Sequence, residues 1–158
     1  MKVKKMKAKL LILSILVTVL AACSKDKFTT KPQLKFKSVN VTELNQGDVL
    51  EFKLQVTDKE GDIQDSIWFQ RISKVCKGEG ANELSDVPSP YAMPKFDSRA
   101  DVNGEITMTF SYNSIGTGYP SLGGCGFRAD TSVFRFWIRD NAQHVSDTIS
   151  SPPITFLK

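Results

Sequence analysis

The chain has 158 residues, of which 41% are hydrophobic, with 21 basic and 17 acidic side chains and a formal net charge of +4. Five of the basic residues lie within positions 1–9, so the rest of the chain carries 16 basic against 17 acidic residues. This balance argues against nucleic-acid binding, which requires clustered Lys and Arg, and the length suffices for one domain that needs no metal or oligomer to support its core.

The N-terminus has the pattern of a bacterial lipoprotein signal. Residues 1–9 contain five lysines and no acid, residues 10–20 are mostly Leu, Ile and Val, and Ala21 and Ala22 precede Cys23. The apolar run is too short to span a bilayer, which takes about 20 residues, but it fits the apolar region of a signal peptide, about 7 to 15 residues long. Small residues before a thiol are the sequence that a lipoprotein-processing peptidase cleaves, in front of a diacylated cysteine.

This signal predicts three parts: a signal peptide at 1–22, a flexible lipid-anchored tether at 23–32 and one domain at 33–158. Two or three acyl chains, such as palmitate, hold a protein firmly at a membrane, because each buried methylene contributes about 0.8 kcal/mol. Ser24 rather than Asp follows the cysteine, which resembles the outer-membrane class of Gram-negative lipoproteins, facing either the periplasm or the exterior. An uncleaved transmembrane anchor and an ordinary secretory signal are the alternatives.

Cys76 and Cys125 are the cysteines left once Cys23 is assigned to lipid. In an oxidising compartment an even pair is usually bridged. A disulfide closing this loop of about 50 residues would stabilise the fold by about 4 kcal/mol. We therefore predict a Cys76–Cys125 disulfide, with two free buried thiols as the alternative.

Period-two alternation of apolar and polar residues predicts strands at 49–57, 105–112 and 132–139. The Asn103-Gly104 pair fits a two-residue hairpin turn that leads into the second of these. Weaker alternation predicts further strands at 34–41, 65–72, 144–149 and 154–156. About seven short strands separated by Gly, Pro and Asp clusters predict an all-β fold, an antiparallel sandwich of two sheets.

Two segments, 56–62 and 136–148, resemble the immunoglobulin-like and PKD-like modules of bacterial surface lipoproteins. Each ends a predicted strand in an Asp-containing turn, and the second continues into Ser and Thr on the returning strand. The resemblance covers about residues 33–158 and implies an immunoglobulin-like sandwich. The chain departs from these modules at Gln143-His144, where a Gly-Asn pair is frequent, and it lacks the antibody-type cysteine pair.

The implied topology sorts the loops between the two ends of the domain. The loops at 58–62 and 140–144 are expected beside the tether, at the membrane-proximal end. The segments at 73–95 and 113–131 are expected at the opposite end, which would bring the two cysteines together and face these loops away from the membrane.

Four aromatic residues are candidates for binding a protein or glycan. Tyr91, Phe96 and Tyr119 lie among Gly and Pro in the distal segments, and loops on a rigid scaffold often carry binding sites. Trp137 could stack on a sugar if it faces outward. The alternatives are that the first three cap the open end of the core and that Trp137 packs between the sheets or against a neighbour.

Acidic residues in the two proximal loops, Asp58, Glu60, Asp62 and Asp140, are weak candidates for a Ca²⁺ site, because this ion takes six to eight oxygen ligands. Their spacing does not match an EF-hand, and Lys59 lies among them. The other interpretation is a solvated acidic turn without metal. No other cofactor is expected.

Catalytic constellations are nearly absent from the sequence. The sole histidine, His144, lies near Asp140, but neighbours along one turn do not by themselves form a nucleophile–base arrangement. One histidine and two bridged cysteines cannot supply the usual zinc ligands. We expect a non-catalytic envelope or cell-surface lipoprotein of the outer membrane, a binding or accessory module for a protein or glycan partner. The alternative is a small envelope hydrolase that uses the acidic loop residues; the sequence carries no indication of oligomeric state.

Overall fold

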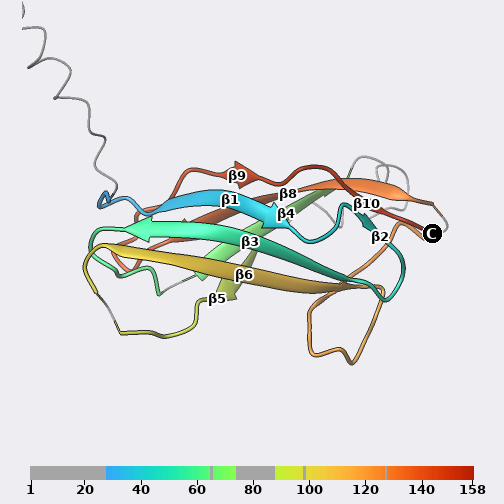
Figure 1. Ribbon diagram of the computed structural model, residues 1–158, viewed down its shortest axis with the longest axis horizontal. Coiled ribbons are helices and arrows are strands. Elements are labelled where there is room, and N and C mark those ends of the chain that lie inside the picture. The colour runs from blue at the N-terminus through green and yellow to red at the C-terminus, as the bar shows by residue number, and fades with distance from the viewer. Residues whose placement is uncertain (1–27, 65, 74–87, 98, 127) are drawn as a thin grey trace, which may run out of the picture.

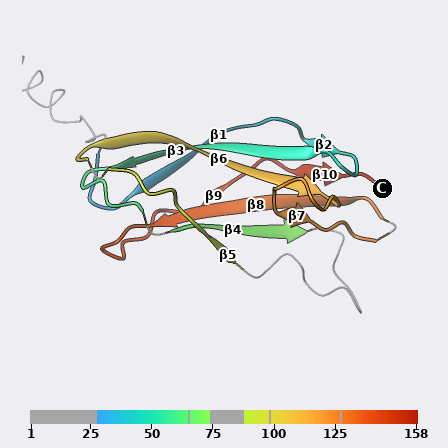
Figure 2. The same ribbon diagram turned by 90° about the horizontal axis from the view of Figure 1, so that it is seen from below.

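The computed structural model describes residues 28–64, 66–73, 88–97, 99–126 and 128–158. Within these ranges the chain forms ten strands in two stacked sheets, which Figure 2 shows as two layers. The predicted all-β sandwich is therefore confirmed. The predicted signal peptide at 1–22, Cys23 and Cys76 lie outside the described residues. In the part of the chain that is described, no helix is long and apolar enough to cross a bilayer.

The first sheet has four strands, in the order β1-β3-β6-β7. Neighbouring long strands in it are antiparallel, whereas β7 pairs with β6 in parallel. Its strands are β1 (Gln33–Val39), β3 (Val49–Asp58), β6 (Val102–Tyr112) and β7 (Ser121–Leu122).

The second sheet has six strands, in the order β2-β10-β8-β4-β5, with β9 also paired to β8. Strands β2 and β10 are parallel, so both sheets are mixed rather than purely antiparallel. β1 joins the four-stranded sheet and β2 joins the six-stranded sheet. The orders β1-β3-β6 and β10-β8-β4 match those of an immunoglobulin-like sandwich, whereas β7 follows β6 in the chain and pairs with it in parallel, unlike the fourth strand of that fold. The strands are β2 (Glu43–Leu44), β10 (Ile154–Phe156), β8 (Asp130–Arg139), β4 (Ser66–Ser73), β5 (Ser89–Ala92) and β9 (Ile149–Ser150).

The expected hairpin turn at Asn103-Gly104 is wrong. Both residues lie inside β6, where they pair with Thr57 and Val56 of β3. A two-residue hairpin of this type needs positive φ at both central residues, and neither has it. The chain reverses instead before β6, where Asp101 has a φ of 58°.

The core is rich in aromatic residues because alternate positions of the long strands face inward. Phe52 of β3 lies across the sandwich from Phe134 and Phe136 of β8, with ring centroids 4.9 and 5.1 Å away. All three side chains are fully buried, and burying each contributes roughly 1.5–3 kcal/mol before the cost of ordering.

The loops at 58–62 and 140–144 lie together, as predicted, at the end of the sandwich where residues 28–32 lead into β1. We call this end the tether end. The Asn141 amide donates to the Asp62 carbonyl at 2.9 Å, and the Lys59 amide donates to the Thr29 carbonyl at 3.2 Å. The start of β1 and the C-terminus lie at opposite ends of the molecule (Figure 1).

The expected distal loop over 73–95 is wrong in part. Residues 89–92 form β5, which runs antiparallel to β4 and returns the chain toward the tether end. The connection from β5 to β6 consequently lies at the tether end (Figure 1). Segment 73–95 therefore begins at the end of the sandwich opposite the tether, where β4 ends, and finishes at the tether end, because β5 runs back antiparallel to β4.

Candidate functional site

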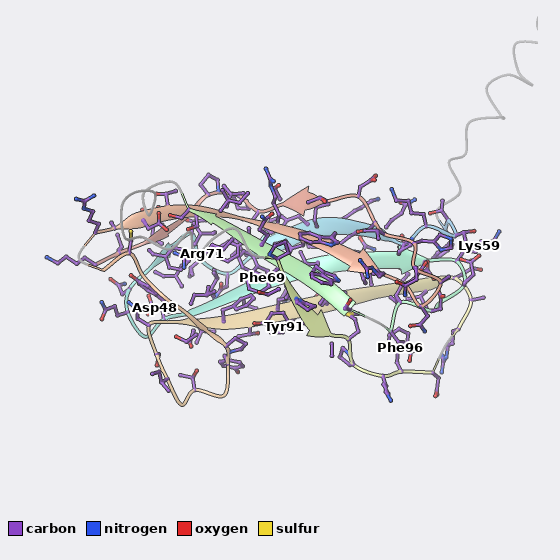
Figure 3. The ribbon with its side chains drawn as sticks, turned by 180° about the vertical axis from the view of Figure 1, so that it is seen from behind. Asp48, Lys59, Phe69, Arg71, Tyr91 and Phe96 are labelled. Atoms are coloured by element: carbon purple, nitrogen blue, oxygen red, sulfur yellow. The ribbon has the colours of Figure 1, made fainter. Side chains whose placement is uncertain are left out.

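Tyr91, Phe96 and Tyr119 do not form one surface. Tyr91 faces the core from β5, with its ring centroid 5.3 Å from that of Phe69 and 6.1 Å from that of Phe110. Burial raises the pKa of Tyr91. Phe96 lies on the loop toward Lys59, well away from Tyr91 (Figure 3). Tyr119, 48% exposed, belongs to the loop between β6 and β7.

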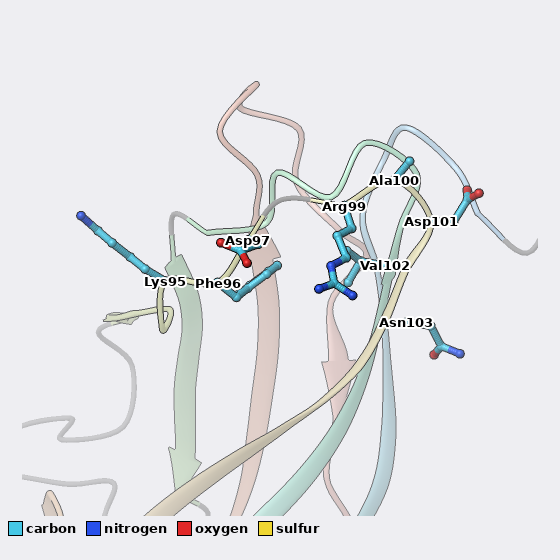
Figure 4. Close-up of a pocket in the computed structure, with 8 residues that line it drawn as sticks. All are labelled: Lys95, Phe96, Asp97, Arg99, Ala100, Asp101, Val102 and Asn103. Atoms are coloured by element: carbon cyan, nitrogen blue, oxygen red, sulfur yellow. The ribbon is translucent and has the colours of Figure 1, made fainter.

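Phe96 lies between two hollows at the tether end. One, of about 700 Å³, is lined by residues 95–97 and 99–103, and Phe96 and Arg99 point toward one another across it (Figure 4). Its lining includes two cationic and two acidic side chains, so its charge favours no particular ligand. The other hollow, of about 360 Å³, is mostly apolar and includes Ile63 and Met93.

Trp137 faces outward, since it alternates with the buried Phe136 and Ile138 on β8. Its register partner on β4 is Trp68, and the two indole planes lie 10° apart with centroids separated by 6.1 Å. Both side chains are partly exposed. The paired indoles therefore form an aromatic surface on the outer face of the six-stranded sheet.

Polar groups surround this pair on the same face. The Arg139 guanidinium carbon lies 5.6 Å from the Trp68 ring centroid, a cation–π distance. Arg135 lies two residues before Trp137 on β8 and is exposed on the same face. Pro90 of the edge strand β5 is the register partner of Trp68. We call these five residues the tryptophan platform.

The structure brings together three of the four predicted calcium ligands. Carboxylate oxygens of Asp58, Asp62 and Asp140 all lie within 4.8 Å of one another. Glu60 is not part of this cluster; its carboxylate accepts a hydrogen bond from Thr30 Oγ1 at 3.1 Å. Asp58 and Asp140 are 0% exposed, so the interpretation as a solvated turn is wrong for these two residues.

Backbone amides hold the acidic cluster in place. Asp58 ends β3, and its Oδ2 accepts from the Gly61 amide at 2.6 Å and the Asp62 amide at 3.4 Å. Asp62 Oδ2 accepts from the Ala142 amide at 3.2 Å, which joins the loop after β3 to the loop after β8. Burial raises the pKa of Asp58, and the two amide bonds oppose this shift.

His144 contacts the cluster through Asp140. Asp140 Oδ1 accepts from the His144 amide at 2.7 Å, and Oδ2 lies 2.9 Å from His144 Nδ1. The nearest hydroxyl in sequence, Ser146 Oγ, accepts from the Ile138 amide and donates to the Asp147 carbonyl. Ser146 is therefore placed as a structural bridge rather than as a nucleophile beside His144.

A buried ion pair was not anticipated from the sequence. Arg71 of β4 faces inward, and its Nη2 lies 3.0 Å from Asp130 Oδ2. Arg71 also donates to Ser132 Oγ at 2.9 Å and to the Gly123 carbonyl at 2.5 Å, while Ser73 Oγ donates to Asp130 at 2.6 Å. Desolvation lowers the pKa of Arg71, and Asp130 opposes that shift. One feature of the sequence could have predicted this pair: Arg71 occupies an inward position in the alternation of the predicted strand 65–72.

The sequence matches no protein-family model and no curated protein sequence. Among solved structures, it is similar to the sporulation control protein Spo0M from Bacillus subtilis, with 8% identity, a TM-score of 0.44, and 82% of this chain and 51% of that chain covered. It is also similar to part of a β-glucosidase from Listeria innocua in complex with gluconolactone, with 16% identity, a TM-score of 0.42, and 81% and 16% covered. The chain thus spans about half of the first protein and a small part of the second. Neither likeness bears on function.

Proposed function

We propose that the chain is a lipid-anchored, non-catalytic envelope protein whose sandwich binds a glycan through the tryptophan platform. The N-terminal pattern supports attachment at Cys23 to the outer membrane, and the cysteine count supports a disulfide between Cys76 and Cys125. The domain then acts as a binding or accessory module at the membrane surface.

The single observation that carries this proposal is the outward pairing of Trp68 and Trp137. Indole faces are large, rigid and apolar, and they suit the C–H face of a sugar ring. Guanidinium groups donate several hydrogen bonds, so Arg135 and Arg139 at the margin of the pair can bind the hydroxyls or acidic groups of a glycan. A flat platform fits an extended chain better than a small enclosed ligand.

The burial of Asp58 and Asp140 favours binding over hydrolysis. A hydrolase that used these carboxylates would have to bring a scissile bond to side chains that are 0% exposed. Their oxygens are also committed in part to the Gly61 and His144 amides. An acid or base for catalysis must lie within hydrogen-bond reach of its substrate.

Intrinsic fluorescence provides a direct test of glycan binding. The chain has two tryptophans, and both belong to the platform, so tryptophan emission reports on this site alone. The purified full chain is titrated with dextran, xylan, mannan and soluble peptidoglycan fragments. We expect at least one of these to change the emission saturably, with the affinity confirmed by calorimetry.

Matched variants decide whether the platform is the site. Truncating a tryptophan that anchors a binding site costs about 1 kcal/mol or more, so Trp137→Ala should weaken binding at least about fivefold. Tyr119→Ala, which truncates an exposed aromatic on the loop between β6 and β7, should leave the affinity unchanged. Binding of none of the four glycans, or an affinity that Trp137→Ala does not alter while circular dichroism shows a folded chain, would reject the proposal. If the platform bound a protein and none of the four glycans, the partner would be that protein and the glycan proposal would be wrong.

Anchoring is tested separately, by mass spectrometry of the protein extracted from membranes. We expect an N-terminal peptide that begins at acylated Cys23. Cys23→Ser should carry no acyl group and should keep residues 1–22, since the peptidase cleaves only in front of a diacylated cysteine. A wild-type protein that retains residues 1–22 and carries no acyl group would support the uncleaved anchor instead.

A further inference from the structure

We propose that Asp58, Asp62 and Asp140 form a Ca²⁺ site that links the two sheets at the tether end. The three carboxylates come from the end of β3, from the loop after it, and from the first residue beyond β8. Each offers an oxygen within 4.8 Å of the oxygens of the other two. This inference does not depend on glycan binding or on lipid attachment.

An unsatisfied oxygen in the cluster points to a ligand. Asp58 Oδ1 is the only buried side-chain nitrogen or oxygen among the described residues that has no hydrogen-bond partner. The other oxygen of the same carboxylate, Oδ2, is held by the amides of the turn. A buried carboxylate oxygen without a partner carries a desolvation penalty that a bound cation removes. Asp58 is thus held by its turn through Oδ2, which leaves the buried Oδ1 available to a cation.

The charge around the cluster is also unbalanced. Among the described residues, His144 is the only basic side chain within 4.0 Å of any of the three carboxylates, with its Nδ1 2.9 Å from Asp140 Oδ2. Lys59 lies in the same turn, but it forms no ion pair with Asp58 or Asp62 among the described contacts. Three close carboxylates repel one another, and a divalent cation offsets that repulsion.

The donor set favours Ca²⁺ over other metals. All three side chains offer oxygen, the ligand type that hard cations prefer, and Ca²⁺ accepts the irregular geometry that loops provide. Carbonyl groups of the two loops and water can complete its six to eight ligands. Zinc would draw on imidazole or thiolate, and His144 Nδ1 already contacts Asp140 Oδ2 at 2.9 Å.

The position of the site gives the ion a structural effect. Asp58 belongs to the four-stranded sheet and Asp140 follows a strand of the six-stranded sheet, so one ion would join both layers. The Asn141–Asp62 and Ala142–Asp62 hydrogen bonds already bring the two loops together there. The ion would stabilise the end of the domain that the tether enters.

Calorimetry with CaCl₂ on the chelator-treated full chain tests the site, together with thermal unfolding in CaCl₂ or EDTA. We expect one Ca²⁺ per chain with a Kd between about 10 μM and 1 mM, and a Tm at least about 3 °C higher in 5 mM CaCl₂ than in EDTA. MgCl₂ at the same concentration should give a smaller shift.

Two variants separate this site from general acidity of the loop. Asp62→Ala, at a partly exposed position, should abolish both the binding heat and the Tm shift while the chain stays folded. Glu60→Gln removes a charge from the same turn but outside the cluster, and it should leave both unchanged. Absence of heat and of a Tm shift up to 10 mM CaCl₂ would overturn the proposal. So would binding that Asp62→Ala does not weaken, or binding that Glu60→Gln weakens equally.

Discussion

Arg71 and Asp130 form an ion pair inside the sandwich, with 9% and 0% of their side chains exposed. The Arg71 guanidinium carbon also lies 4.1 Å from the ring centroid of Phe156 on β10. Through the Gly123 carbonyl, the same guanidinium holds the segment that connects β7 to β8. The pair thus joins three strands and one loop at the end of the domain opposite the tether.

Breaking this pair should destabilise the fold strongly. Asp130→Asn leaves a buried guanidinium without its counter-charge, and loss of one partner of a buried pair costs about 3–5 kcal/mol. We expect the free energy of unfolding, measured in urea, to fall by that amount. Glu105→Gln is the matched control, because Glu105 pairs with Lys37 and Lys53 at a half-exposed surface, where such pairs contribute less than about 1 kcal/mol. A loss below about 1 kcal/mol in Asp130→Asn would contradict the structural role assigned to the pair.

Gly61 should not tolerate a side chain. It has a φ of 74°, and a Cβ atom there would lie 1.9 Å from the Arg99 carbonyl oxygen. Gly61→Ala therefore combines a strained backbone with displacement of a neighbouring loop. Gly47→Ala isolates the first effect, since Gly47 has a φ of 93° and a Cβ atom there would have nothing within 4 Å. We expect Gly47→Ala to cost about 1–2 kcal/mol of unfolding free energy and Gly61→Ala at least about 1 kcal/mol more. Equal losses would show that the loop gives way without cost.

Stability should fall above about pH 10 because of two tyrosines, Tyr112, which is buried, and Tyr91, which is partly buried. Burial raises the pKa of Tyr112, with Arg71 lowering it and Asp130 raising it, and burial also raises the pKa of Tyr91. Each phenol therefore ionises at lower pH in the unfolded chain than in the folded one. The folded state keeps its full stability below the unfolded pKa of about 10 and loses it as the pH rises toward the folded pKa.

Phenylalanine variants measure this effect from urea unfolding between pH 7 and 11. Tyr91→Phe should leave the stability at pH 7 nearly unchanged and make the alkaline decline shallower. Tyr112→Phe should show the same shallower decline but start about 1 kcal/mol lower, because Tyr112 Oη donates to the Leu157 carbonyl at 2.7 Å. Tyr119→Phe, on an exposed loop, serves as the control. If stability declined as steeply at alkaline pH in all three variants as in the wild-type chain, the decline would be due to groups other than Tyr91 and Tyr112.

Alternation identified the long strands because each buries one face along most of its length. The same series continues one step beyond the predicted strands: Leu54, Val56 and Asp58 are inward on β3, and Ile138 leads to Asp140 after β8. Burial of the two acids was therefore readable from the pattern. Their convergence with Asp62 was not, since it depends on the pairing of two loops from different sheets.

Short strands were beyond the reach of periodicity. Strands β2, β7 and β9 have two residues each, which is too few to show an alternation. Strand β5 contains Pro90, which disfavours a central strand but is accepted at an edge, and β5 is the edge of its sheet. Missing β5 placed Phe96 at the wrong end of the domain and left Tyr91 assigned to a loop.

The cysteine prediction is settled by a double-mutant cycle. Cys125 lies between β7 and β8, and Cys76 is outside the described residues, so the bridge stays a prediction. If the two are bridged, Cys76→Ser and Cys125→Ser each remove the same covalent link, and each should lower the unfolding free energy by about 2–4 kcal/mol. The double variant should then lose no more than either single one, and reduction of the wild-type chain should give the same loss. Two free buried thiols would instead give losses that add, together with a wild-type stability that a reductant does not change.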